Sequence, residues 1–568
     1  MPKIVTVEQM RAIEAATDAA GVSYAEMMDR AGRAVADLVI ERLGGRPEPH
    51  VVVLVGPGNN GGDGLVAGRL IAEEIDAEVD FYLLKPRPDD DDNLAKLVAA
   101  GLAVAEADDD DDWSVLRELI WTADVIVDAL LGTGTRLPVK GTLAELLTVV
   151  REALAERAAA AADVFTFNTP GEPRVNWDNG RPLVVAVDCP SGLDCDTGEV
   201  DPVTLPADDT VTFAAVKTGQ IRFPGAGLLG QLHVAGIGTP ADLDLLRDID
   251  LELADALTVR ALLPPRPRDG HKGTFGKALI VAGSANYVGA AALAAVAAYR
   301  VGTGWVTVAA PQPVVPMLAS RITEATWLYL PHDMGVLAPQ AAEVLRKELE
   351  PYQAMLLGPG WGQEKATAEF LAELLGPERA KGKRAMGFIQ GQPAHAHENS
   401  PAPLPSLVID ADGLNLLAQL DDWPALTPPG TILTPHPGEM ARLCDLDHAA
   451  VEADRLALAR ERAAAWGCVV VLKGAHTVVS APDGRVCVMP FATSALATAG
   501  TGDVLAGAIV GFRAQGLEPF EAAVAGAYIH GLAGLEAAGR LLSERSVTAG
   551  DVRDSLALAL AMVESAMC

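Results

Sequence analysis

Short apolar runs alternate with amphipathic stretches along most of the chain. Apolar residues at helical spacing predict helices over residues 8–43, and the run Val51–Val55 predicts a buried strand that ends at a glycine-rich turn. Further strands are predicted over residues 79–84, 124–128, 183–187, 210–213, 278–282, 355–357, 407–409, 431–434 and 468–472, most of them followed by a helical pattern. This alternation predicts an α/β protein whose sheets are doubly wound, with helices on both faces.

The periodicity breaks near the middle of the chain. Residues 251–267 are rich in Pro and Arg, so we place a linker near residues 240–262 and expect one domain over 1–240 and a second over 255–568. Each is expected to be a three-layer α/β/α domain. A segment at 383–406 has the composition of a loop, and its His395 and His397 are interpreted as solvated rather than as metal ligands.

Charge and cysteine usage narrow the class of protein. The 568 residues include 44 Lys and Arg against 76 Asp and Glu, a formal charge of -32, which argues against nucleic acid or an anionic membrane as partner. The six cysteines form no CxxC pair, so neither a zinc site nor a disulfide framework is indicated. No signal core or membrane-length apolar run is found, and we expect a cytoplasmic protein with reduced thiols. A homo-oligomer is also expected, and Met27 and Met28 are interpreted as packing or oligomer contacts.

The first predicted glycine turn has two interpretations. Gly56, Gly58 and Gly61 satisfy GxGxxG after a strand and before a helix, which is the context of a nicotinamide-dependent dehydrogenase. The second strand, however, ends in Lys85-Pro86, where a ribose-binding acid would be expected. The turn also carries the polar residues Asn59, Asn60 and Asp63, so its side chains are better interpreted as ligands.

Ionisable residues follow three of the predicted strands in the first domain. Asp128 and Asp188 each end a strand, and carboxyl ends of parallel strands meet at one sheet edge. Either acid alone is equally a helix cap, but with the Asn loop the two form a polar crescent. Lys217 ends another strand and, facing Asp188, would make an acid/base pair. The aspartate runs 89–92 and 108–112 are interpreted as solvated loops.

A second set of candidate residues lies in the second domain. The turn Gly500-Thr501-Gly502 opens an apolar helix, whose free N–H groups and dipole suit a phosphate, and Asp503 on the same turn can accept a proton from a hydroxyl. An ordinary glycine loop with Asp503 as helix cap is the alternative. His436 is fixed between two prolines, and Lys473, followed by a hairpin over 478–488, fits the lip of a nucleotide site.

Residues 1 to about 240 resemble the epimerase domain of the bifunctional NAD(P)H-hydrate repair enzymes. The matching motifs are GPGNNGGDG (56–64), DALLGTG (128–134), DCPSGLD (188–194) and KTG (217–219); residues 151–181 depart from the pattern as an insertion. The resemblance implies Asp188 and Lys217 as catalytic residues. It also implies a K⁺ site at Asn60, Asp128 and Ser191, and a binding site for the hydrated nucleotide at Asn59, Asn60, Gly61, Gly62, Asp63, Gly132, Thr133, Gly134, Thr135, Arg136 and Asp188.

The second half resembles the dehydratase domain of the same family, which is ribokinase-like. The motifs are GHKGTFG, LGPGWG, DADGLNLL, TPHPGE, LKGAHT and TAGTGDVLAG, in this order. The resemblance implies Asp503 as the catalytic base and the hydrate bound at Ala290, Gly360, Gly362, His436 and Asp503. It places the second nucleotide at Lys473, Gly474, Ala475, His476, Thr477, Gly500, Thr501 and Gly502.

The function implied by the resemblance is repair of NADH and NADPH hydrated at C6 (NADHX and NADPHX). The first domain would interconvert the R and S epimers, and the second would dehydrate the S form at the expense of ADP, with ATP as the other possible donor and Mg²⁺ as metal ion. The alternative is a ribokinase-type small-molecule kinase whose N-terminal domain binds without catalysing.

Overall fold

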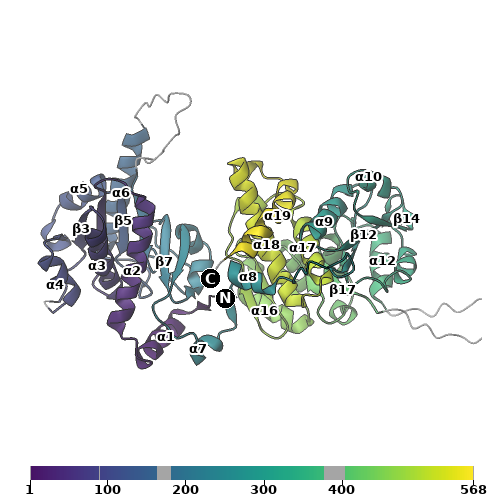
Figure 1. Ribbon diagram of the computed structural model, residues 1–568, viewed down its shortest axis with the longest axis horizontal. Helices are drawn as coiled ribbons and strands as arrows, with labels where there is room; N and C mark the ends of the chain where they lie inside the picture. The colour runs from purple at the N-terminus through teal and green to yellow at the C-terminus, as the bar shows by residue number, and fades with distance from the viewer. Residues whose placement is uncertain (1, 89, 163–180, 377–402, 567–568) are drawn as a thin grey trace, which may run out of the picture. The chain divides into compact units, whose positions relative to one another are not determined.

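The computed structural model describes residues 2–88, 90–162, 181–376 and 403–566 (Figure 1). The chain divides into two compact units, residues 2–249 and the chain from Asp250 onward. Most of the two segments interpreted as an insertion and a loop, including His395 and His397, lies outside the described residues, as does Asp89.

The first unit is built around seven parallel strands in the order β4-β3-β2-β5-β6-β7-β9. Its strands are β1 (Ile4–Val5), β2 (His50–Val55), β3 (Glu78–Leu83), β4 (Ala103–Glu106), β5 (Val125–Ala129), β6 (Leu183–Val187), β7 (Asp209–Phe213), β8 (Val216–Lys217) and β9 (Gln231–Ala235). Its helices are α1 (Val7–Ala19), α2 (Tyr24–Leu43), α3 (Asn59–Glu74), α4 (Asp92–Ala99), α5 (Ser114–Thr122), α6 (Thr142–Ala162) and α7 (Asp244–Arg247).

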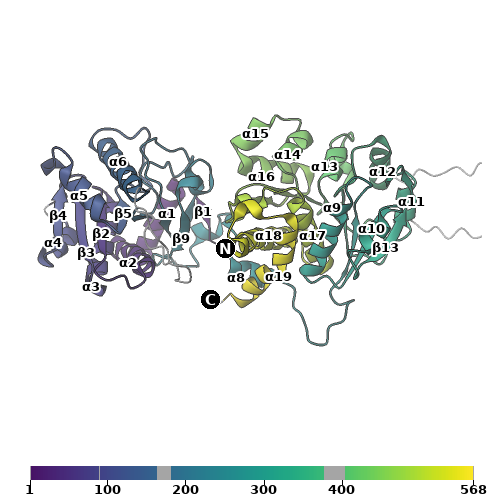
Figure 2. The ribbon, with the colours of Figure 1, turned by 90° about the horizontal axis from the view of Figure 1, so that it is seen from above.

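Helices cover both faces of this sheet. Residues that alternate along the strands, such as Val52, Leu54 and Ile126, pack with α5 and α6 in one apolar cluster. On the other face α3 approaches so closely that a Cβ on its Gly68 would lie 2.5 Å from Phe81. Figure 2 shows α2 and α3 on one side of the strands and α5 and α6 on the other. Strands buried on both faces explain the continuous apolar runs in the sequence.

The second unit contains a ten-stranded sheet in the order β10-β21-β20-β19-β18-β17-β16-β11-β12-β13, antiparallel only where β20 pairs with its two neighbours. Its strands are β10 (Leu251–Leu253), β11 (Lys277–Val281), β12 (Trp305–Pro311), β13 (Thr326–Leu330), β14 (His332–Asp333), β15 (Val336–Leu337), β16 (Ala354–Leu357), β17 (Ser406–Ile409), β18 (Ile432–Leu433), β19 (Val469–Leu472), β20 (Val478–Ser480) and β21 (Val486–Val488). Its helices are α8 (Ala256–Leu262), α9 (Val288–Arg300), α10 (Val315–Ala319), α11 (Ala341–Arg346), α12 (Lys365–Leu375), α13 (Asp412–Leu417), α14 (Pro437–Cys444), α15 (His448–Ala453), α16 (Arg455–Trp466), α17 (Thr501–Ala514), α18 (Pro519–Leu541) and α19 (Ala549–Ser565).

Two apolar clusters sandwich this sheet. Ala278, Ile280 and their counterparts on β16 to β19 pack against α9, α17, α18 and α19, while Leu279, Val281 and the alternate residues pack against α11 to α13. Helix α17 lies directly on α9, because a Cβ on Gly507 would come within 2.3 Å of the Ala294 carbonyl oxygen. This contact fixes the helix whose first turn carries Asp503.

The predicted fold class is confirmed: both units are α/β with parallel sheets and helices on both faces. Several elements differ from the sequence interpretation. The helical stretch 8–43 is two helices, each with its own capping box, and α6 continues through Ala162, so the start of the expected insertion is helical. Leu251–Leu253, in the region read as linker, forms β10 and pairs with β21. No helix in the described ranges is long and apolar enough to cross a membrane.

Candidate active sites

The first site forms where β2, β5, β6 and β7 end at the same edge of the sheet. Asp188, with φ 65, directly follows β6. The ammonium of Lys217 donates to Asp188 Oδ1 at 2.6 Å, to Thr212 Oγ1 at 2.8 Å and to the Phe213 carbonyl oxygen at 3.2 Å. An ammonium has three N–H donors, and all of Lys217's are matched. Lys217 is 1% exposed, so this is a buried lysine that is ion-paired with the Asp188 carboxylate.

Asp128 and Ser191 form a second buried contact beside this pair. The Ser191 N–H donates to Asp128 Oδ2 at 2.8 Å and its hydroxyl donates to Oδ1 at 2.6 Å. Burial raises the pKa of Asp128, against the effect of these hydrogen bonds. No cation of the described residues is paired with it. A buried carboxylate of this kind would be stabilised in its charged form by a bound positive ion.

Asn60 and Asp188 converge on Gly132. A Cβ at Gly132 would lie 3.0 Å from Asn60 Oδ1 and 3.3 Å from Asp188 Oδ2. The buried Nδ2 of Asn60 makes no hydrogen bond to any residue that the structure describes. An unmatched buried amide is costly, so this group is a candidate for contact with a ligand. The expected Asn loop and GTG segment are therefore side by side.

The first site holds more acids than its lysine neutralises. Burial and then the charge of Asp188 raise the pKa of Asp63 well above its usual range. The same two causes, in the same order, raise the pKa of Glu14, which comes from α1. Glu14 was missed by the sequence interpretation, because an acid on an amphipathic helix carries no local signal of a site.

The remaining predicted residues of this site form its rim and its support. Arg87 holds the glycine turn by donating to the carbonyl oxygens of Gly56 at 2.7 Å and Gly58 at 3.3 Å. The Thr135 hydroxyl donates to the Gly132 carbonyl oxygen at 2.9 Å, which uses it to shape its own turn. Asn59, Gly134 and Arg136 are exposed; Thr133 is half-buried; Gly61 and Gly62 are buried in α3, and a Cβ on Gly62 would meet Met28 at 2.7 Å. Met28 is thus a packing residue.

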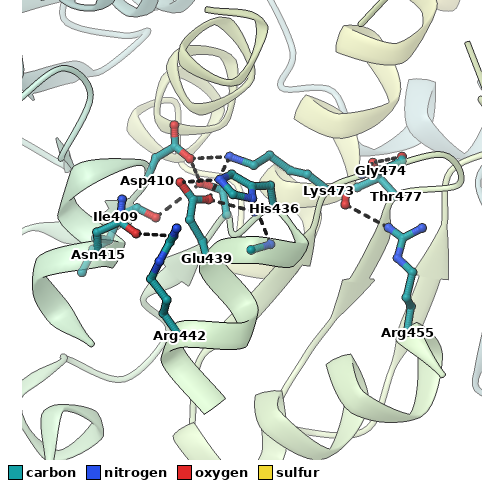
Figure 3. A network of polar contacts seen from close by, with 12 residues as sticks. Ile409, Asp410, Asn415, His436, Glu439, Arg442, Arg455, Lys473, Gly474 and Thr477 are labelled. Carbon is teal, nitrogen blue, oxygen red and sulfur yellow. Dashed lines mark hydrogen bonds and ion pairs between the residues drawn. The ribbon is translucent and has the colours of Figure 1, made fainter. Parts of the chain in front are cut away.

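The second site forms in the same way at the ends of four neighbouring parallel strands. Strands β16, β17, β18 and β19 lead respectively into Gly358, Asp410, Thr434 and Lys473. Figure 3 shows Asp410, His436, Glu439 and Lys473 meeting at this edge. Sequence reasoning quoted the motifs that contain Asp410 and Glu439 but gave neither residue a role.

Lys473 joins the buried carboxylates of this site. Its Nζ lies 2.8 Å from Asp410 Oδ1 and 3.5 Å from Glu439 Oε2. Burial acts to lower the pKa of Lys473, but Asp410 and Glu439 outweigh it, so the net pKa is raised and the side chain is charged. Burial also raises the pKa of Glu439. Asp410 is 1% exposed and accepts a further hydrogen bond from Thr434 Oγ1 at 2.7 Å.

Asp503 lies in the first turn of α17, next to this cluster. Gly500 has φ 92 and caps the helix, and a Cβ there would crowd Leu293 at 2.8 Å, so the turn requires glycine. A Cβ at Gly502 would lie 3.4 Å from Lys473 Nζ, which places the ammonium beside the free N–H groups of the turn. Burial, followed by the charge of Asp410, raises the pKa of Asp503 to about 7. Asp503 is therefore set up to exchange a proton near neutral pH.

His436 faces the same cluster as a neutral imidazole. The Gly438 N–H donates to His436 Nδ1 at 3.0 Å, so the ring proton belongs on Nε2, which lies 3.4 Å from Glu439 Oε1. Burial and the nearby charge of Lys473 lower the pKa of His436 to about 4. The ring is half exposed and offers an N–H donor at every pH near neutrality.

Three of the residues expected to hold the hydrate come from one glycine turn and from the start of α9. A Cβ at Gly360, which has φ 65, would lie 2.8 Å from the Cβ of Ala290 at the start of α9. The Gly362 N–H donates to Asp412 Oδ2 at 2.9 Å, which ties this glycine turn to the loop that carries Asp410. The turn and α9 therefore form one wall next to the carboxylates.

Arg455 holds the backbone of the expected nucleotide lip, residues 473–477, in place. Its guanidinium donates to the carbonyl oxygens of Leu472, Lys473 and Ala475, and a Cβ on Gly474 would lie 2.6 Å from it. The His476 N–H donates to the Phe491 carbonyl oxygen and the Thr477 hydroxyl to the Gly474 carbonyl oxygen. The Thr501 hydroxyl likewise donates within its own turn, to Leu496. Arg455 lies at the start of α16, outside every quoted motif, and was missed.

Comparison with known proteins bears on both units. Residues 278–556 match the family model described as NAD(P)H-hydrate dehydratase, and residues 24–219 match the one described as YjeF-related protein N-terminus. The chain is 36% identical to a bifunctional NAD(P)H-hydrate repair enzyme of Moorella thermoacetica over 95% of this chain and 92% of the relative. It is 31% identical to the enzyme of the same name from Escherichia coli K12 over 91% and 86% of the two chains.

The fold, with one polar site at the strand ends of each sheet, defines an α/β enzyme of two units. The chain belongs to the family of bifunctional NAD(P)H-hydrate repair enzymes. It is also similar to a solved ADP/ATP-dependent NAD(P)H-hydrate dehydratase of Bacillus subtilis co-crystallised with ATP/Mg²⁺, with 28% identity, a TM-score of 0.44 and coverage of 55% of this chain and 99% of that one.

Replacing Lys473 by Met is expected to destabilise the second unit by about 3 kcal/mol, because it leaves two buried carboxylates without their cation. Thermal unfolding of the full chain followed by circular dichroism measures the change. Lys347→Met is the matched control, since Lys347 pairs with Glu343 on an exposed face and exposed pairs contribute little. Equal unfolding temperatures for the two variants would show that the Lys473 cluster does not stabilise the fold.

Proposed function

We propose that this chain repairs hydrated NADH and NADPH, epimerising the hydrate in a domain over residues 1–240 and dehydrating its S form, at the expense of ADP, in a domain over 255–568. Family membership supports the proposal, and one observation carries it. Asp503, with a pKa raised to about 7, lies on a glycine turn at a helix start, beside the buried ammonium of Lys473. This arrangement joins a base to a phosphate-binding turn.

Dehydration requires a better leaving group than hydroxide. Asp503 accepts the proton of the C6 hydroxyl as its oxygen attacks the terminal phosphorus of the nucleotide, so that ADP becomes AMP. The N–H groups of Gly500 and Gly502 and the ammonium of Lys473 hold the transferring phosphoryl group, while the Thr501 N–H donates to the Thr498 carbonyl oxygen. The lone pair of the ring nitrogen then expels phosphate, and loss of the C5 proton leaves the C5=C6 bond of NAD(P)H. The atoms balance as hydrate plus ADP giving NAD(P)H, AMP and phosphate.

Mg²⁺ fits this site as a partner of the nucleotide rather than of a protein cage. In the described part of the chain, no three or more His, Cys, Asp or Glu residues cluster so as to hold a metal ion. Mg²⁺ commonly uses one or two carboxylates plus phosphate oxygens and water, and Asp410 and Glu439 are the carboxylates at hand. Bound there, the ion would neutralise phosphate charge.

The other predicted residues orient the two substrates. The Nε2–H of neutral His436 can donate to the hydrate, and the wall formed by Gly360, Gly362 and Ala290 would pack against its ring. The lip from Lys473 to Thr477 would hold the nucleotide, for which we propose ADP rather than ATP. A homo-oligomer and a cytoplasmic location stay predictions.

Epimerisation inverts C6, so the C6–O bond must break and form again: the ring nitrogen expels the protonated hydroxyl as water, and water adds to the other face of the iminium ion as a base takes its proton. Asp188 takes that proton in our proposal, and Lys217 holds its carboxylate with one of its three occupied donors. Asn60, with its unmatched amide, and Gly132 would position the hydrate. The oxygens of Asn60, Asp128 and Ser191 suit a hard cation, and K⁺ there would compensate the buried charge of Asp128.

The purified chain should restore the absorbance of reduced nicotinamide when it is given hydrated NADH, Mg²⁺ and ADP. Asp503→Asn should lower this rate at least about hundredfold while the fold is retained, because the base is lost but the turn is kept. Free phosphate is measured in parallel. A stable phosphorylated product with no recovered absorbance would favour the small-molecule kinase, and no reaction with either ADP or ATP would refute the dehydratase.

The dehydration rate should depend on the ionisation of Asp503. Because its pKa is raised to about 7 and the base must be charged, kcat/KM for the hydrate should fall about tenfold per pH unit below pH 7. His436, with a pKa of about 4, stays neutral over this range. Initial rates between about pH 5.5 and about pH 8.5 test this, with the exposed Asp421→Asn as control. A rate that stays constant down to about pH 5.5, as expected for an aspartate with the usual pKa of about 3.9, would contradict it.

Asp188→Asn and Lys217→Met should each slow interconversion of the R and S hydrates roughly hundredfold, the first by removing the base and the second by removing the cation that keeps it charged. Chromatographic separation of the epimers measures the rate. The matched control is Lys140→Met, an exposed lysine of the same unit, and dehydration of pure S hydrate should persist in all three variants. Unchanged epimerisation in Asp188→Asn would make the first unit a binding module.

A further inference from the structure

Two cysteines lie against each other in the loop that carries Asp188. Cys189 follows Asp188 directly, and Cys195 comes six residues later; both are buried and unbridged, with their Sγ atoms 2.8 Å apart. Their spacing matches no thiol motif, so the pairing could not be predicted from the sequence. The other described cysteines lie apart in the second unit: Cys444 in α14, Cys468 in the turn before β19, and Cys487 in β21.

The backbone on both sides of the pair is fastened to one short segment. The Gln220 side chain donates to the Asp188 carbonyl oxygen at 2.7 Å, and the Gly219 N–H donates to the Cys195 carbonyl oxygen at 2.7 Å. Gly219 admits no side chain, since its Cβ would lie 2.4 Å from the Asp194 carbonyl oxygen. The two thiols are therefore held together by anchors outside the loop and do not meet by chance rotation.

A bond between these sulfur atoms needs little movement but affects the site. A disulfide has an S–S distance of about 2.05 Å, so the sulfurs must approach by less than about 1 Å. The loop that would tighten includes Asp188, whose Oδ1 is held by Lys217, and Ser191, whose N–H and hydroxyl are held by Asp128. Displacements of this size at a catalytic group can lower a rate by about a hundredfold.

We propose that Cys189 and Cys195 are a redox-modification site: a peroxide or a low-molecular-weight disulfide converts the pair to an intramolecular disulfide that slows epimerisation and leaves dehydration unaffected. With a peroxide, one thiolate takes an oxygen and becomes a sulfenic acid, with release of water or an alcohol. The second thiol displaces that oxygen as another water, so two protons and two electrons leave the protein. With a disulfide, two thiol equivalents are released instead.

The surroundings of the pair set its reactivity. Both thiols are buried, so an oxidant reaches them only when the loop opens locally. Oxidation is therefore expected over minutes to hours under sustained oxidant rather than in seconds. A thiol reductant reverses the bond once the loop opens locally.

The test uses the full chain, reduced and then exposed to hydrogen peroxide or to oxidised glutathione. After denaturation and alkylation, mass spectrometry should show the peptide with Cys189 and Cys195 lighter by two hydrogens and unalkylated. Epimerisation should fall about tenfold or more, should recover with dithiothreitol, and should be accompanied by unchanged dehydration of S hydrate. Cys195→Ala should keep its epimerisation rate in oxidant, and the matched control Cys444→Ala should lose it as the natural chain does.

Two outcomes would overturn the proposal: both thiols remain alkylatable after prolonged oxidation, or Cys195→Ala is slowed as much as the natural chain. A disulfide that forms without slowing epimerisation would show that this bond does not regulate the activity. The inference about activity rests on the proposed epimerase function, whereas the mass measurement does not. A reduced chain without any epimerase activity would therefore refute that function and leave the disulfide tested on its own.

Discussion

Each unit of this protein is organised around one buried lysine that is surrounded by more carboxylates than it can neutralise. In the second unit Lys473 pairs with Asp410 and Glu439, and Asp503 is the acid that has no ion pair with it. Asp503 therefore feels burial and the charge of Asp410 without a direct partner, and its pKa rises to about 7. In the first unit Lys217 pairs with Asp188. The further acids of the site are Asp63 and Glu14, and their pKa values are raised. An excess of buried acid therefore raises the pKa values of carboxyl groups in both sites, that of Asp503 to about 7.

Sheet topology is what allows such an excess to be assembled. Strands β16 to β19 are parallel neighbours, so the residues that follow them reach one edge although they are far apart in the chain. Helix α17 adds its first turn because Gly507 lets it lie on α9 without side chains between them. Arg455 donates to the carbonyl oxygens of Leu472 and Lys473 and so fixes the backbone that carries the Lys473 side chain. The charged residues are costly to bury, and the apolar clusters on both faces of the sheet offset that cost.

The parts of this structure that could be predicted from sequence are those with a local signal. Apolar runs and glycine turns indicated the parallel strands and the loops after them, including those that carry Asp188, Lys217, His436 and Lys473. Strands β12 and β13 were not recognised, because their apolar runs lack a glycine turn with ligand-like residues. Glu14 and Arg455 enter the sites from helices through tertiary contacts alone. The contact between Cys189 and Cys195 depends on anchors at Gly219 and Gln220, which spacing within the loop does not reveal.

The two lysines differ in the donors that they leave for a ligand, and this difference matches the two kinds of chemistry. Lys217 gives its three N–H groups to Asp188, Thr212 and Phe213, so it can hold a base in its charged form but cannot reach a substrate anion. Lys473 contacts Asp410 and Glu439, and its Nζ also faces the space beside Gly502, at the free N–H groups of α17. Epimerisation exchanges the C6 hydroxyl through water and needs a positioned base but no phosphoryl group. Phosphoryl transfer builds negative charge on the phosphoryl oxygens, and a hydrogen-bond donor must stabilise it. In the described structure the ammonium of Lys473 lies beside the turn and can do so.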